Sequence, residues 1–196
     1  MVDRYSREPY FEPMAEDAHQ PADVAPYIRH LSIKRFRGIE VLSWFPDKGM
    51  NVLLGGGDVG KSTILDAIAM LLSPTNAATL SDADYWQRRH EDGFEISAAM
   101  ALPLNCGIVE QRKASWPWEW SADGPKLPDL GANDGQPLDP VFCVRVRGTP
   151  DFELQHEICQ PDDSVDHFPV SVSRNIGVVR LGGDDRNDRD LRLIQG

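Results

Sequence analysis

The sequence has few cysteines and no long apolar run, and each shortage excludes a class of protein. Its 196 residues include three cysteines, Cys106, Cys143 and Cys159, which are widely spaced and form no CxxC pair. This spacing supports neither a zinc site nor a disulfide framework and predicts reduced thiols in a cytoplasmic protein. No apolar run approaches the roughly 20 residues that span a bilayer, and the polar N-terminus lacks a signal-peptide core. We therefore expect no membrane partner.

Basic residues are also in short supply. Lysine and arginine total 20 against 31 aspartates and glutamates, which gives a formal net charge of -11. A chain of this charge repels nucleic-acid phosphates over most of its surface, so any DNA contact must be local or made through another part of a longer protein. Hydrophobic residues make up 41% of the chain, which is enough to build a core.

The chain divides into an irregular tail and one structured region. Residues 1–26 contain four prolines, scattered acids and no periodicity, which predicts an irregular N-terminal tail. Residues 27–196 are expected to form a single domain. Tyr27–Arg37 and Ile39–Phe45 have the pattern of two strands joined at Gly38. Met50–Leu54 is a short apolar run of the kind that becomes a buried strand.

A helix is predicted over Lys61–Leu72, where apolar residues recur at three- and four-residue spacing. The sequence after this helix shows a less regular hydrophobic pattern. Gly148–Asp151 is expected to join two strands as a hairpin, and residues 114–140, rich in Trp, Pro, Gly and Asp, are expected to form a long surface loop. The further predicted strands are Phe94–Leu102, Val141–Arg147, Phe152–Cys159 and Ile176–Leu181.

One motif carries chemistry: Gly55–Ser62 matches the P-loop pattern G-x-x-x-x-G-K-[ST]. Glycines let the backbone wrap closely around a phosphate, and the amides that open the following helix favour an anion. Lys61 would place an ammonium on the terminal phosphates and stabilise developing negative charge, while the Ser62 hydroxyl would bind Mg²⁺. The predicted nucleotide-binding residues are Gly55, Gly56, Gly57, Asp58, Val59, Gly60, Lys61, Ser62 and Thr63.

Other P-loop signatures help to define the class. The GTPase motifs DxxG and NKxD are absent from the chain. An acidic Mg²⁺ ligand at a strand end is not found either, because Gly182 and Gly183 separate Asp184 and Asp185 from the candidate strand Ile176–Leu181. Two predicted strands precede the P-loop, a layout that differs from that of small P-loop kinases.

The stretch from Tyr27 to Pro74 resembles the N-terminal part of ABC-type ATPase heads. The residues that carry the likeness are Ile28–Gly38, Asn51–Leu54 and Gly60–Ile68. The phrase L-x-I-x-x-F-R-G followed by G-K-S-T-x-L-D-A-I is most similar to OLD (overcoming lysogenization defect) ATP-dependent endonucleases, and RecF-like and SMC proteins share this kind of head.

The resemblance implies an α/β fold: the N-terminal lobe of a P-loop NTPase with an antiparallel β layer, forming an incomplete ATPase domain. It also implies ATP and Mg²⁺ as cofactors and a homodimer or second ATPase head as partner. DNA would be reached indirectly, through the full-length protein, in DNA repair or phage defence. Because the signature motif, Walker B and nuclease residues of such proteins lie downstream, we expect a fragment, a truncated reading frame or one part of a split system. Such a chain should hydrolyse ATP poorly or not at all when alone.

Three arginine groups leave alternatives open. By resemblance, Arg37 is a candidate contact to nucleotide phosphate, and the alternative is a solvated arginine at a hairpin end. For Arg88 and Arg89 a solvated basic patch is the favoured interpretation. A small-molecule kinase would need lid arginines, for which Arg186, Arg189 and Arg192 are the candidates. A non-catalytic nucleotide-binding interaction domain is the third hypothesis.

Overall fold

The first two strands form a hairpin whose alternating residues supply one wall of the core. The computed structural model describes residues 25–57, 59–72, 79–103, 106–108, 115–129 and 137–179. Strand β1 (Tyr27–Phe36) pairs antiparallel with β2 (Ile39–Trp44), which confirms the two predicted strands. Leu31 and Ile33 of β1 are fully buried. Phe36 pairs with Ile39, so the strands are joined by a turn of only two residues, Arg37 and Gly38.

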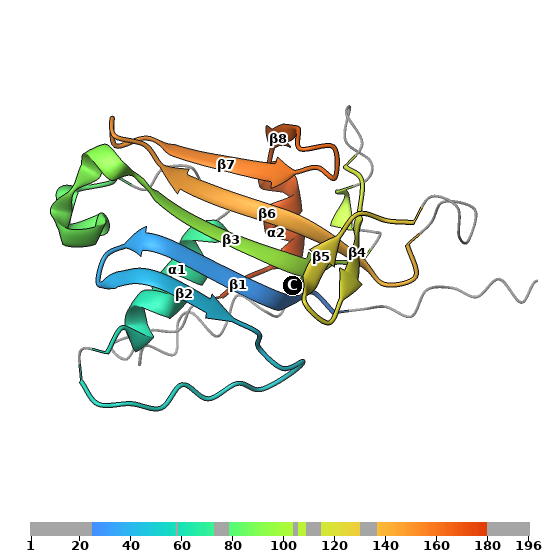
Figure 1. Cartoon of the computed structure of the whole chain (residues 1–196), viewed down its shortest axis with the longest axis horizontal. Coiled ribbons are helices and arrows are strands. Elements are labelled where there is room, and N and C mark those ends of the chain that lie inside the picture. Colours follow the sequence, from blue (N-terminus) through green and yellow to red (C-terminus); the bar gives the residue numbers. More distant parts are fainter. Residues whose placement is uncertain are drawn as a thin grey trace, which may run out of the picture.

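The remaining strands extend this hairpin into one antiparallel sheet (Figure 1). β1 pairs with β3 (Phe94–Ala101), β3 with β6 (Pro140–Gly148), β6 with β7 (Leu154–Cys159), and β7 with β8 (Val165–His167). The predicted strands in these regions are confirmed. So is the hairpin at Gly148–Asp151, which closes with a hydrogen bond of 2.9 Å from the Thr149 amide to the Glu153 carbonyl.

The predicted surface loop at 114–140 contains a second hairpin, so the prediction is wrong over residues 118–126. β4 (Trp118–Ser121) pairs with β5 (Gly124–Lys126) and also with the start of β6. The indole Nε1 of Trp118 donates a hydrogen bond of 2.8 Å to the Cys159 carbonyl. Aromatic side chains favour strands when they can pack against a neighbouring strand, and β6 supplies that neighbour.

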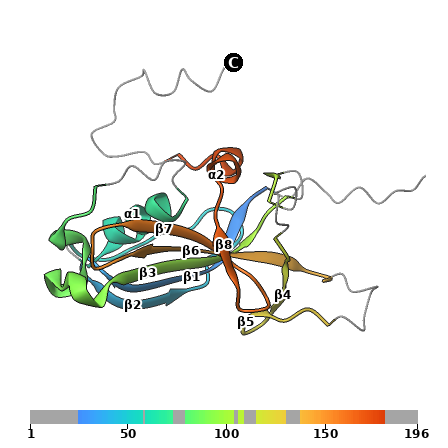
Figure 2. The same cartoon turned by 90° about the horizontal axis from the view of Figure 1, so that it is seen from above.

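The two α-helices lie on the same side of the sheet (Figure 2). α1 (Lys61–Leu71) confirms the predicted P-loop helix and buries Ala67 and Leu71. α2 (Val170–Ile176) buries Val172. Facing strand residues and Phe168, which lies between β8 and α2, complete the core; the strand residues include Leu31, Ile33, Phe94, Ile96, Met100, Phe142, Val144, Val146 and Ile158. Three short 3-10 helices, η1 (Asp82–Asp84), η2 (Trp86–Arg88) and η3 (His90–Asp92), connect α1 to β3.

The run Met50–Leu54 is not a buried strand, so this prediction is wrong as well. It has no regular secondary structure, and Met50, Val52 and Leu54 are 92%, 69% and 87% exposed. In Figure 1 the chain between β2 and α1 runs outside the sheet as a wide loop. A strand is stable only when neighbouring strands share its hydrogen bonds, and none of the described residues pairs with this run.

The predicted strand Ile176–Leu181 is also wrong where the structure describes it. Ile176 ends α2, and Gly177 follows in the left-handed conformation at φ 68° that commonly terminates helices. Pro169 at the N-cap marks the other end. Residues 180 and 181, the N-terminal segment 1–24 and the acidic and arginine-bearing segment after 181 lie outside the described residues. No helix within the described part of the chain is long and apolar enough to cross a membrane.

His156 on β7 ties the sheet to the end of the P-loop helix. It is 4% exposed, and its Nε2 lies 3.0 Å from the Met70 carbonyl near the end of α1. A carbonyl accepts only, so Nε2 carries the proton, and Nδ1 has no hydrogen-bond partner among the described residues. Burial lowers the pKa of His156 below its ordinary 6.5, and nearby His167 lowers it further against the opposing effect of the Met70 bond.

This environment predicts acid sensitivity below pH 6.5. Below pH 6.5 His156 is protonated in the unfolded chain but stays neutral in the folded protein. The free energy of unfolding therefore falls by up to about 1.4 kcal/mol for each pH unit, until the pH reaches the lowered pKa of the folded protein. His156→Gln keeps a donor for Met70 but does not titrate. Denaturant unfolding between pH 5 and 7 should show a shallower pH dependence for the variant, whereas parallel curves would refute the prediction. Subtracting the two curves removes the contribution of His30, whose pKa burial also lowers.

Candidate phosphate-binding site

Gly60 sets the geometry of the predicted P-loop. It is the N-cap of α1, with φ 87° in the left-handed region that glycine adopts at little cost. Its carbonyl accepts the first helical hydrogen bond, from the Ile64 amide at 3.0 Å. Because a glycine has no side chain to cap the helix, and because the first turn of α1 holds no acidic residue, no carboxylate of that turn competes for an anion there. The amides at the start of α1 are therefore open to an anion.

The loop before Gly60 folds back on itself, so that its start lies close to Val59. A Cβ added at Gly55 would lie 2.9 Å from Cγ2 of Val59, closer than side chains normally approach. The Lys61 ammonium donates a hydrogen bond of 2.8 Å to the Gly55 carbonyl and a second one to the Gly56 carbonyl. The cationic group therefore lies inside the curve of the loop, on the side where the motif would place phosphate oxygens.

A cavity of about 410 Å³ lies at the start of α1 beside this loop. Its wall is formed by Gly38, Val59, Gly60, Lys61, Ser62 and Thr63. A cavity of this size is within the range that holds small ligands, and its polar groups are amides, hydroxyls and one ammonium. That donor set fits a phosphate group, and the exposed hydroxyl of Ser62 at the start of α1 is placed to bind a cation beside it.

Most of the predicted site residues come together here. Val59, Gly60, Lys61, Ser62 and Thr63 line the cavity, and the carbonyls of Gly55 and Gly56 hold the Lys61 ammonium. Gly57 is exposed at the tip of the loop. Asp58 lies outside the described residues.

Arg37 is not the solvated arginine of the second interpretation, because its guanidinium is paired with two carboxylates. Its Nε donates to Asp84 Oδ1 at 3.0 Å, and its Nη1 forms an ion pair with Asp66 Oδ2. Its guanidinium also lies over the Phe36 ring, 5.0 Å from the centroid. Arg37 does not line the 410 Å³ cavity, whereas its neighbour Gly38 does. A contact from Arg37 to a bound phosphate stays a prediction.

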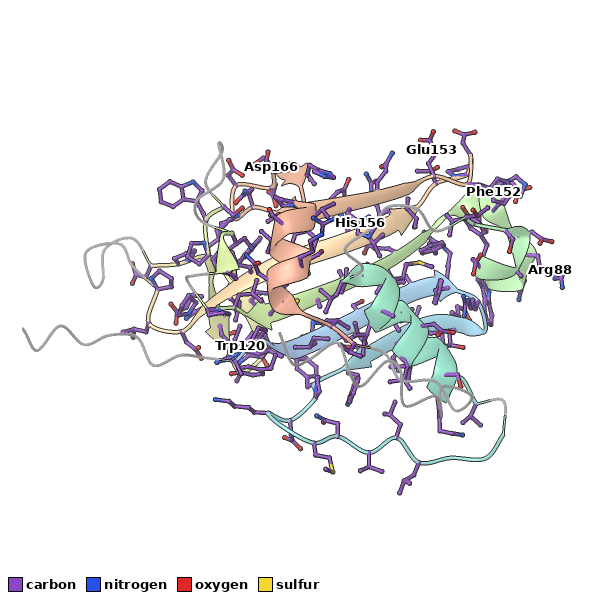
Figure 3. All side chains as sticks on the ribbon, turned by 180° about the vertical axis from the view of Figure 1, so that it is seen from behind. Arg88, Trp120, Phe152, Glu153, His156 and Asp166 are labelled. Carbon is purple, nitrogen blue, oxygen red and sulfur yellow. The ribbon has the colours of Figure 1, made fainter. Side chains whose placement is uncertain are left out.

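Arg88 and Arg89 are exposed and carry their own counter-ions. Arg88 lies 3.3 Å from Asp82, and Arg89 lies 3.1 Å from Asp92. Figure 3 shows Arg88 at the outer end of the sheet, near Phe152. Exposed pairs of this kind add little stability and leave little net charge for a phosphate.

Sequence reasoning missed three residues at the site: Gly38, Asp66 and Asp84. Asp66 stands in the motif G-K-S-T-I-L-D and Asp84 in the phrase S-D-A-D-Y, but a carboxylate next to an anion site has no obvious role in sequence terms. Only the fold shows that these acids face Arg37. The signal in the sequence is the presence of acids in the two segments after the hairpin turn that could pair with Arg37. A search for such charge pairs would have found Asp66 and Asp84.

The fold and the site define a mixed α/β lobe in which an antiparallel sheet stands beside a P-loop and its helix, as predicted. Residues 34–83 match the family model described as the P-loop containing region of AAA domain. The chain thus carries a P-loop region of the kind found in nucleotide-binding ATPases, which usually bind their nucleotide with Mg²⁺.

One solved structure similar to this chain comes from the study "Structural biochemistry of ATP-driven dimerization and DNA stimulated activation of SMC ATPases". The two share 15% identity over 85% of this chain and 96% of that chain, with a TM-score of 0.49. So distant a likeness assigns no residue and no activity.

Proposed function

We propose that this protein binds the phosphates of Mg²⁺–ATP in the cavity at Gly55–Thr63 as the nucleotide-binding lobe of an ABC-type ATPase. The single observation that carries the proposal is the Lys61 ammonium lying inside a glycine loop at the open end of α1. Phosphate oxygens would replace the Gly55 and Gly56 carbonyls as its partners. An ammonium bound to a charged acceptor forms a stronger hydrogen bond than one bound to a neutral carbonyl, which favours this exchange.

Hydrolysis is proposed to need a partner. Among the described residues, no carboxylate lines the cavity to activate water or hold Mg²⁺ through water. The resemblance of Tyr27–Pro74 to OLD- and RecF-like heads supports a second head acting in trans, in a homodimer or with a partner chain. It also supports a role of the full-length protein in DNA repair or phage defence. The same cavity composition favours a second candidate, a lobe that senses nucleotide without turnover.

Calorimetric titration of the purified protein with ATP, with and without Mg²⁺, tests the proposal. We expect saturable binding at one site per chain that Mg²⁺ strengthens. Turnover should appear only with a partner chain; binding that never leads to turnover would favour the sensing lobe. Absence of any ATP binding by the folded protein would overturn both.

Ser62→Ala should distinguish the contribution of Mg²⁺ to ATP binding from that of the phosphate contacts. Without the hydroxyl ligand, the strengthening of ATP binding by Mg²⁺ should fall about 10-fold, which corresponds to about 1.4 kcal/mol, while binding in EDTA stays unchanged. Titration of ATP at fixed Mg²⁺ concentrations measures both quantities. The exposed Ser43 on β2, changed to alanine, is the matched control. An unaltered Mg²⁺ effect in Ser62→Ala would contradict the assignment of Ser62.

A further inference from the structure

Three segments that are separate in sequence meet at Arg37. The residue sits in the two-residue turn between β1 and β2, with φ 49°, a conformation that side-chain-bearing residues adopt only when surrounding contacts hold it. Its amide donates to the Asp84 carbonyl at 3.0 Å and its Nε donates to the Asp84 carboxylate at the same distance. Its Nη1 pairs with Asp66 of α1. The turn is thus fastened to both η1 and the P-loop helix.

The Asp84 carboxylate that holds Arg37 is itself fixed. The second oxygen of Asp84 accepts hydrogen bonds from the Ser81 amide at 3.0 Å and the Ser81 hydroxyl at 3.2 Å. The side chains of Asp84 and Asp66 are 12% and 17% exposed, so solvent screens these ion pairs less than it screens surface pairs. An isolated bridge between Phe36 and Tyr85 joins the same two segments beside the ion pairs. We name Arg37, Asp66 and Asp84 the turn clamp.

The turn clamp acts on the wall of the phosphate cavity. Gly38, next to Arg37, lines that cavity, and the Ile39 side chain reaches to 3.5 Å from where a Cβ on Gly60 would stand. The position of the turn therefore sets both the width of the cavity and the packing behind the glycine that opens α1. In Figure 1 the β1–β2 turn and the 3-10 helices lie at the same end of the sheet.

Two roles for Arg37 follow from its chemistry, and the contacts favour one of them. Nε and Nη1 of Arg37 already donate to two partly buried carboxylates, and Arg37 does not line the cavity; turning the whole guanidinium to a phosphate would take the charged partner from both carboxylates at a cost. As a residue that holds the β1–β2 turn in place, Arg37 needs no contacts beyond those it already makes with Asp66 and Asp84. We propose that Arg37 is a positioning residue, and that the turn clamp holds Gly38 and Ile39 against the P-loop so that the cavity keeps the shape that binds phosphates. This inference rests on the proposed function.

The two roles predict opposite behaviour for Asp84→Asn. If the clamp positions the wall, removing either partner loosens the same turn. Asp84→Asn and Arg37→Gln should then each weaken MgATP binding about 10-fold, the size expected for one charge-assisted contact, and the double variant should be no weaker than either. If Arg37 binds phosphate directly, Arg37→Gln should weaken binding, while Asp84→Asn should leave it unchanged or strengthen it by freeing the guanidinium.

Calorimetric titration of the wild type and the three variants with MgATP distinguishes the roles through Asp84→Asn, and repeating it with Mg-tripolyphosphate shows whether the loss lies at the phosphate end of the site. The clamp predicts the same loss for both ligands, because it shapes the phosphate end of the site. Asp82→Asn is the matched control, since Asp82 lies in the same 3-10 helix but pairs with exposed Arg88. It should bind within about two-fold of the wild type, as surface pairs contribute little.

The stoichiometry and a second variant guard against simple misfolding. An unfolded fraction lowers the number of binding sites and leaves the Kd of the folded fraction alone, whereas the clamp changes the Kd. Should Asp84→Asn fail to fold, Asp66→Asn tests the other carboxylate with the same expectation, and Arg37→Lys should recover part of the affinity. Unchanged or tighter binding by the carboxylate variants, or additive losses, overturns the clamp while the proposed function stands. No binding by the wild type overturns both.

Discussion

Replacing Lys61 by alanine should weaken MgATP binding at least about 100-fold, equivalent to about 2.7 kcal/mol. In the structure the ammonium reaches into the loop and is the one cationic group on the wall of the described cavity. A polyphosphate carries several negative charges into this small space, and without the ammonium the backbone amides alone must balance them. The loss should appear in calorimetric titrations as disappearance of measurable binding at micromolar protein.

Folding should not suffer from the same change. Among the described residues the Lys61 side chain bonds to backbone carbonyls of its own loop, so Lys61→Ala should move the free energy of unfolding by less than about 0.5 kcal/mol. Lys48→Ala is the matched control: Lys48 is exposed in the turn after β2, its ammonium lies 5.4 Å from the Tyr27 ring centroid, and it does not line the cavity. Binding of MgATP by Lys61→Ala at the wild-type affinity would refute the phosphate assignment.

How far the sequence predicts this site depends on how local each feature is. The P-loop and its helix follow from a contiguous motif, because glycine freedom and helix amides are properties of neighbouring residues. The strands β1, β3, β6 and β7 follow from alternation, which one buried face imposes on each strand separately. The turn clamp could not be predicted in this way, since its members are 29 and 47 residues away from Arg37 in the chain.

The two wrong strand predictions and the missed hairpin have one physical cause. Apolar character shows that a segment can be buried, but pairing decides whether it becomes a strand. Met50–Leu54 has the apolar residues but pairs with none of the described strands. Trp118–Ser121 lies in a stretch whose composition predicts a loop, yet it pairs with β6. Ile176–Leu181 is apolar as well, but Ile176 ends α2, Gly177 terminates that helix, and Val178 and Val179 pair with none of the described strands.

A single methyl group at Gly148 should destabilise the protein by about 3 kcal/mol, the upper end of typical overpacking effects. Gly148 ends β6, and a Cβ there would stand 2.1 Å from Cε1 of the Phe94 ring. The ring is 2% exposed and packs against Phe36 and Tyr85, with centroids 5.0 and 5.3 Å away, so it has little room to move. Chemical denaturation of Gly148→Ala should show this loss at an unchanged m-value.

The clash can be tested apart from any backbone effect. Phe94→Leu removes ring atoms that the methyl group would strike. The loss in free energy of unfolding of the double variant Gly148→Ala, Phe94→Leu should therefore be smaller than the summed losses of the two single variants by at least about 1 kcal/mol. Gly38→Ala is the control glycine, because an added Cβ meets nothing within 4 Å there, and we expect a change below about 0.5 kcal/mol. Since Phe94 lies against Phe36, the residue before the Arg37 turn, Gly148→Ala should also weaken MgATP binding in the folded fraction. Wild-type stability in Gly148→Ala would show that the aromatic cluster beneath the turn is not packed as described.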